Sequence, residues 1–223
     1  MIREVWTILQ KDLRLELRRS ENFIAMFFFA FIILLIFSFA LPSEGENHQL
    51  IAPGVYWVTF LLSGILGLSK NFALEKEMGC MEALLISPVS RGSIFLGKML
   101  GTLIFMVLMQ GILIPVFALI FYTPAIEFFW DLLMLSCATA LGFSALGTLL
   151  SGLTTDVRFK EILLPILLFP LLIPLLLASV EVMASILAGQ GIQGELDWLK
   201  LLIGFDFIFL IAAYLTFDFV MEL

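Results

Sequence analysis

The run at residues 92–99 comes closest to a motif with known chemistry. It reads Gly-Ser-Ile-Phe-Leu-Gly-Lys-Met and nearly matches the phosphate-binding pattern GxxxxGK[ST]. Met99 replaces the hydroxyl residue that would reach Mg²⁺, no strand-like segment precedes the run, and an apolar helical pattern continues through it. We therefore reject a nucleotide site here. Gly97 and Gly101 form instead a GxxxG pair, a weak pattern that allows two membrane helices to approach closely.

No other reactive residues form a catalytic constellation. The sequence has one histidine and two cysteines, without HExxH and without a Ser–Lys or paired-Asp arrangement of convincing spacing. Cys80 and Cys137 show no CxxC spacing, so neither a disulfide framework nor a zinc site is indicated, and we expect both to be small apolar packing residues. The sequence therefore favours a chain that catalyses no reaction itself.

The composition predicts a single all-α membrane domain spanning residues 1–223. Of the 223 residues, 61% are hydrophobic and 14% are charged, against about 25% charged in an average soluble domain. A soluble chain of this length cannot bury that much apolar surface. We expect lipid, and no nucleic acid, around it. The net charge of −7 does not indicate an acidic partner surface, because the two signs occupy different places.

Six continuous apolar runs are each long enough to cross a bilayer. A helix needs about 20 apolar residues for a hydrocarbon core about 30 Å thick, and continuous rather than alternating runs predict helices. The predicted spans are 23–41, 51–69, 94–121, 129–153, 162–180 and 199–221.

Residues 1–20 predict an amphipathic helix at the membrane interface. Apolar residues recur at helical spacing, and basic residues supply the opposite face. The apolar set is Ile2, Val5, Trp6, Leu9, Leu13 and Leu17, and the basic set is Arg3, Lys11, Arg14 and Arg18. The alternative is an ordinary helix packed on the protein itself.

Lysine and arginine predict the orientation of the spans. Eleven of the twelve basic residues lie before the first span, in the loop between the second and third spans and its flanks, or after the fourth span, and Lys200 is the exception. The other three loops carry acids, among them Glu181. We therefore expect a bacterial inner-membrane protein with both termini in the cytoplasm and residues 42–50, 122–128 and 181–198 outside.

The longest cytoplasmic connection contains a short amphipathic helix, Glu75–Pro88. Met78, Met81 and Leu85 share one helical face, Glu75 and Glu82 lie away from it, and Pro88 limits the helix. A methionine-bearing apolar face in the cytoplasm is typical of a surface that docks into the groove of a partner. The alternative is an interfacial helix without a partner.

Two features inside the spans could carry mechanism. Pro165, Pro170 and Pro174 fall in the fifth span, where each removes an intrahelical hydrogen bond. Either the helix is kinked and gates a path, or the kinks are tolerated in a static bundle. Asp206 is an ionisable group a turn or two from the outer end of the sixth span. It either lines a lateral path or an inter-subunit contact, or extends to the interface.

Several segments together resemble the haem exporter B proteins of the cytochrome c maturation system, the CcmB family of ABC-transporter permease subunits. They are Ile51-Ala-Pro-Gly-Val-Tyr-Trp57, Gly67-Leu68, Glu82-Ala-Leu-Leu-Ile-Ser-Pro88 and Leu164-Pro-Ile-Leu-Leu-Phe-Pro-Leu-Leu-Ile-Pro174. The resemblance runs from about residue 5 to the C-terminus. Met78-Gly-Cys-Met departs from the family pattern, which more often has an acidic residue, Gly, Ser or Thr, then Leu.

The resemblance implies a membrane subunit that works with a separate cytoplasmic ATPase. Further membrane subunits, a haem chaperone and a second permease copy are the other implied partners. The complex would export haem or release the haem-loaded chaperone, with no tightly bound cofactor in this chain. By position, the coupling helix that docks on the ATPase would comprise Glu75, Met78, Met81, Glu82, Leu85, Ser87 and Pro88. His48 and Trp57 are the candidate haem contacts, and for His48 the alternative is a solvated residue of the first outer loop.

One rival function shares this architecture. A permease of a drug or polysaccharide ABC exporter would have similar spans and a similar coupling segment, but not the proline-rich fifth span. ATP hydrolysis would belong to a partner chain in either case.

Overall fold

A computed structural model describes residues 2–18, 21–41, 46–69, 89–121, 123–154 and 160–220. The described residues form helices and no strand. The α-helices are α1 (Ile2–Arg18), α2 (Glu21–Ala40), α3 (Glu46–Ser69), α6 (Arg91–Ile120), α7 (Phe129–Leu153), α8 (Lys160–Leu187) and α9 (Leu196–Val220). Two short 3-10 helices, η1 (Thr123–Ile126) and η2 (Ile192–Glu195), lie before α7 and α9.

Six of these helices are long and apolar enough to cross a membrane, namely α2, α3, α6, α7, α8 and α9. Continuous apolar sequence makes helices here because only a helix satisfies its own backbone polar groups in lipid. The chain is therefore an all-α, multi-pass membrane protein, as the sequence predicted.

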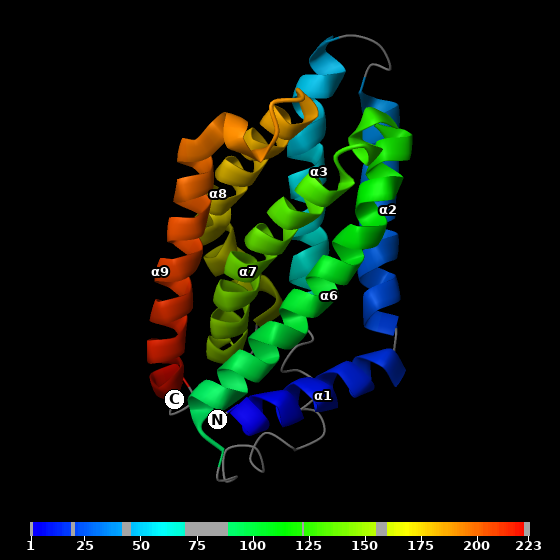
Figure 1. Ribbon diagram of the computed structural model, residues 1–223. Coiled ribbons are helices and arrows are strands. Elements are labelled where there is room, and N and C mark those ends of the chain that lie inside the picture. Colours follow the sequence, from blue (N-terminus) through cyan, green and yellow to red (C-terminus); the bar gives the residue numbers. More distant parts are fainter. Residues whose placement is uncertain are drawn as a thin grey trace.

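The six long helices run side by side, and α1 lies across one end of their bundle (Figure 1). The centre is formed by α3 and α7, in each of which 67% of the apolar window is buried, against 22% in α2 and in α9. The inner face of α7 is built from small residues, among them Gly142, Ala145 and Gly147. Small side chains at this face allow neighbouring helices to approach closely.

Two helix boundaries differ from the sequence prediction. Helix α8 continues to Leu187, so Glu181 lies on an exposed helical face and not in a loop. The helix extends because no breaker occurs before Gly189 and Gly191, whose φ angles of 78° and 70° favour glycine. Similarly, α3 begins at Glu46, which places His48 in its first turns and corrects the predicted outer loop.

Candidate functional site

Helix α1 is seated on α6 through matching rows of residues spaced four apart. The pairs are Glu4 with Ser93, Ile8 with Gly97, and Asp12 with Gly101. Interlocking rows of this spacing are a common way for two helices to cross. The apolar face expected for α1 is divided: Leu9 is buried, whereas Ile2 and Trp6 are exposed. Helix α1 therefore contacts α6 through a stripe of residues that includes the acids Glu4 and Asp12. The location of α1 at the membrane interface stays a prediction.

The first contact ties α1 to the beginning of α6. The Ser93 hydroxyl donates a hydrogen bond to Glu4 Oε2 at 2.8 Å. The backbone N–H of Ser93 donates to the Ser90 side chain, which caps the helix. The bond from Ser93 holds the pKa of the Glu4 carboxyl below its usual range. Glu4 is consequently ionised at neutral pH, beside the positive end of the α6 dipole.

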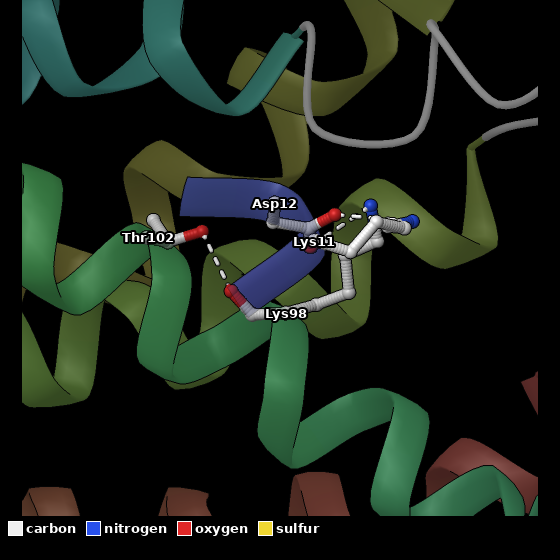
Figure 2. Close-up of polar contacts among 4 residues, drawn as sticks. All are labelled: Lys11, Asp12, Lys98 and Thr102. Carbon is white, nitrogen blue, oxygen red and sulfur yellow. Dashed lines mark hydrogen bonds and ion pairs between the residues drawn. The ribbon is translucent and has the colours of Figure 1, made fainter. Parts of the chain in front are cut away.

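A buried ion pair fixes the third contact. Lys98 Nζ lies 3.3 Å from Asp12 Oδ2, and Lys11 Nζ lies 3.1 Å from Asp12 Oδ1. The side chain of Lys98 is only 2% exposed and that of Asp12 is 15% exposed. In Figure 2 the two lysine side chains converge on Asp12, while the Thr102 hydroxyl donates to the Lys98 carbonyl at 3.1 Å. An ammonium this deeply buried requires a close counter-charge.

The middle contact explains the GxxxG pair. A Cβ atom on Gly97 would lie 2.7 Å from Ile8 Cγ2 and 3.3 Å from the Val5 carbonyl oxygen. A Cβ atom on Gly101 would lie 3.9 Å from its nearest neighbours, which is ordinary contact. Gly97 of this pair therefore allows the close approach of α1, which crosses the end of the bundle, whereas the sequence had suggested a contact between two membrane helices.

We expect Gly97→Ala to destabilise the protein and Gly101→Ala to leave it nearly unchanged. The new methyl group at Gly97 meets backbone and a branched Cβ that cannot turn away, and overpacking of this kind costs about 1–3 kcal/mol. The thermal midpoint of unfolding in detergent measures both variants. Equal midpoints for the two would contradict the close seating of α1.

The interior of the bundle holds a polar cluster that joins three spans. The Tyr56 hydroxyl of α3 donates to Gln110 Oε1 of α6 at 2.5 Å and lies 3.4 Å from Ser136 Oγ of α7. Trp57 is 1% exposed and packs edge to face on Tyr56. Within the described residues, Gln110 Nε2 and Trp57 Nε1 are buried without a hydrogen-bond partner. Buried polar atoms of this kind are costly in lipid and often functional.

Asp206 lies near the middle of α9, deeper than the sequence suggested, and is 5% exposed. Its carboxylate faces Gly142 of α7, where a Cβ atom would collide with Oδ1, and Leu175 of α8 lies close to the same point. Within the described residues Oδ1 has no hydrogen-bond partner. The carboxylate is thus enclosed by three helices and does not extend to the interface.

The remaining predicted site residues are dispersed. The coupling segment Glu75–Pro88, with Cys80, lies outside the described residues. Helix α8 is continuous through all three prolines; Pro170 and Pro174 are exposed and Pro165 is half-buried. The position of the His48 side chain is likewise outside what the structure describes. Cys137 is exposed on α7, so it does not fill a core position.

Sequence reasoning missed the Asp12–Lys98 pair and the Tyr56–Gln110 bond. One signal was available: Glu4, Asp12 and Glu16 recur at multiples of four, which places three acids on one stripe of the helix. The sequence interpretation had considered only the apolar and basic residues of this helix. A lysine in the first turns of an apolar span was the other half of the pattern. The pairing of Asp12 with Lys98 could be recognised only from the position of α1 on α6.

Comparison with known proteins gives a consistent result. The family described as CcmB protein matches residues 3–220. The chain is 31% identical over 193 residues to Heme exporter protein B of Rhodobacter capsulatus, covering 86% of this chain and 88% of the relative. It is 31% identical to the protein of that name in Pseudomonas aeruginosa, over 86% of each chain. It is 32% identical to that of Paracoccus denitrificans, over 82% of this chain and 83% of the relative.

Proposed function

The chain belongs to the CcmB protein family, and we propose that it is the membrane subunit of an ABC transporter that exports haem for cytochrome c maturation. The family match over nearly the whole chain carries this proposal, together with relatives named Heme exporter protein B. The six apolar helices agree with a transport subunit. Haem is the cargo in this proposal and not a resident cofactor.

ATP hydrolysis belongs to a separate cytoplasmic subunit in this proposal. The segment Glu75–Pro88 docks on that ATPase, with Met78, Met81 and Leu85 as its apolar face. The described helices on either side support this, since α3 ends and α6 begins close to the seat of α1 (Figure 1). A displacement of the segment would therefore act on α6 and α1 together. In this proposal the conformational change of the ATPase reaches the membrane helices through Glu75–Pro88, whether haem itself is moved or a haem-loaded chaperone is released.

The proposed orientation is supported by the basic residues at one end of the bundle. The end crossed by α1 carries Lys11, Arg91 and Lys98, whereas Glu127 and Glu195 lie before α7 and α9. The positive-inside rule counts lysine and arginine and gives acids little weight, so in this proposal the end crossed by α1 faces the cytoplasm of a bacterial inner membrane. A cysteine placed at Gln49 should react with an impermeant thiol reagent in intact spheroplasts. Reaction only after lysis would reverse the orientation.

Helix α8 and Asp206 form the moving part of the path in this proposal. Each proline of α8 removes a backbone donor and weakens the helix as a rigid rod. Asp206 packs beside α8, and an ionisable group inside a membrane protein is by default a candidate for a functional role. Replacing Asp206 with Asn keeps its shape and removes its charge, so a normal yield of c-type cytochromes in that variant would exclude the role.

Deletion of the gene in its own organism tests the function. We expect c-type cytochromes, detected by their covalent haem, to be lost and then restored by the wild-type chain. The control is a b-type cytochrome, whose haem is not attached covalently and which should persist. Normal c-type cytochromes together with a defect in surface polysaccharide or drug resistance would favour the rival exporter function.

A further inference from the structure

An exposed face of α1 carries three arginines, Arg3, Arg14 and Arg18, which we call the arginine row. Helical spacing brings the three residues onto one side of the helix, and all of them are exposed. The arginine row is separate from the stripe that contacts α6, to which Glu4 and Asp12 belong. Helix α1 therefore has one side that is used for packing and another that is open.

The side chains of the arginine row are not used inside the described part of the protein. Among the described residues, no ion pair or side-chain hydrogen bond involves the guanidinium of Arg3, Arg14 or Arg18. Lys11, the other basic residue of the predicted face, differs because it pairs with Asp12 at 3.1 Å. Three positive charges on one side of α1 are thus available to a ligand outside the chain.

Large apolar side chains adjoin the arginine row. Ile2 is 84% exposed and Trp6 is 57% exposed. An indole ring on a basic helix favours the boundary between lipid head groups and acyl chains. Helix α1 crosses one end of a bundle whose six long helices are apolar enough to span a membrane, which places it at the level of the head groups (Figure 1). At that level the apolar side chains enter the acyl region and the arginines meet the head groups.

We propose that the arginine row binds the phosphate groups of anionic phospholipids. A guanidinium donates two parallel hydrogen bonds to phosphate oxygens, which makes arginine well suited to this ligand. Residues 3–18 extend over about 22 Å of helix, which is longer than one head group, so the row contacts more than one lipid. A zwitterionic lipid also has a phosphate, but its ammonium group enters the same positive field. Net-anionic lipids such as phosphatidylglycerol are therefore preferred.

Charge complementarity with the membrane surface is the reason to assign lipid to this face. Anionic lipids attract basic residues that lie close to the surface, and Ile2 and Trp6 match the acyl region beneath it. An acidic protein surface would meet the same arginines, and the experiment below separates the two. The lipid contact and the contact with α6 use different stripes, so α1 makes both at once. This inference goes beyond the proposed function and does not depend on which cargo is moved.

Lipid titration of the delipidated full-length protein tests the proposal. Phosphatidylglycerol or phosphatidylcholine is added in zwitterionic detergent, and bound lipid is counted by native mass spectrometry. We expect phosphatidylglycerol to bind more tightly, with an advantage that shrinks as salt is raised. A basic residue at an anionic surface contributes about a fivefold factor in affinity. Arg14→Gln should therefore weaken phosphatidylglycerol binding about fivefold, and Arg3→Gln, Arg14→Gln and Arg18→Gln together about a hundredfold.

Two further variants control for charge and for place. Lys200→Gln removes an exposed cation that pairs with Asp197 at 2.8 Å near the other end of the bundle, and it should leave phosphatidylglycerol binding unchanged. Lysine at all three positions of the arginine row keeps the charges and should keep most of the affinity. The thermal midpoint of the triple glutamine variant should equal that of the wild type, because the arginine row is exposed and separate from the contact with α6.

Three results would overturn the proposal. Equal affinity of the wild type for the two lipids would mean that the row does not select an anionic head group. Unchanged phosphatidylglycerol binding in the triple glutamine variant would place the lipid elsewhere, and loss of the ATPase from that variant on co-purification would assign the row to an acidic protein surface. A lowered thermal midpoint would mean that the arginines act within the protein.

Discussion

Replacement of Met81 and Leu85 together by Asp is expected to reduce association with the ATPase subunit by a factor of about 10³ or more. A docking helix buries only a few apolar side chains, each of which contributes about 1.5–3 kcal/mol when fully buried. Both residues belong to the apolar face inferred from the sequence. The double change removes their contribution and places two charges against an apolar groove. Co-purification of the tagged chain with the ATPase measures the effect.

A matched control places the same two charges on the opposite face of the segment. Cys80 and Ala83 lie about half a helical turn away from the apolar face, so Asp at both positions should leave the complex intact. Both double variants should still accumulate in the membrane, because the segment lies outside all six spans. If the Met81 and Leu85 variant retains its partner at the wild-type level, another cytoplasmic surface performs the docking.

The spans were predictable because lipid imposes a simple rule on the sequence. A continuous apolar run of about 20 residues has to be a helix, and the fourth span was predicted with its observed bounds, Phe129–Leu153. The fifth span was predicted too short for a physical reason. The hydrophobic pattern stops at Glu181, but hydrogen bonding continues to Leu187 because nothing before Gly189 breaks the helix.

The contacts between elements were less accessible from the sequence. Ile8 was not assigned to the apolar face of α1, yet it is buried against Gly97, because the stripe that meets α6 is offset from the most apolar one. Asp206 was expected near the outer end of its span, whereas it lies enclosed beside Gly142. Both facts depend on how two helices are rotated against each other, and composition and spacing do not contain that rotation.

Asp12→Asn is expected to lower the free energy of unfolding by about 1.5–3 kcal/mol, the range for the loss of a hydrogen bond between charged groups. The cause is the burial of Lys98, which is 2% exposed and loses the carboxylate at 3.3 Å. Lys98→Met should cost less, because Asp12 is 15% exposed and keeps Lys11 at 3.1 Å. Unfolding in mixed detergent, followed by circular dichroism, gives the free energies of both single variants.

The double variant Asp12→Asn with Lys98→Met distinguishes the pair from two separate defects. Neither charge then remains buried, so the double variant should be more stable than Asp12→Asn alone, although it carries one substitution more. Lys200 and Asp197 provide the control: their charged atoms are closer, at 2.8 Å, but the side chains are 73% and 94% exposed, so Asp197→Asn should have no measurable effect. Burial, and not distance, therefore decides which ion pair matters. Additive losses in the double variant would mean that Asp12 and Lys98 stabilise the seat of α1 independently, and the pair could not then hold α1 and α6 together as one unit.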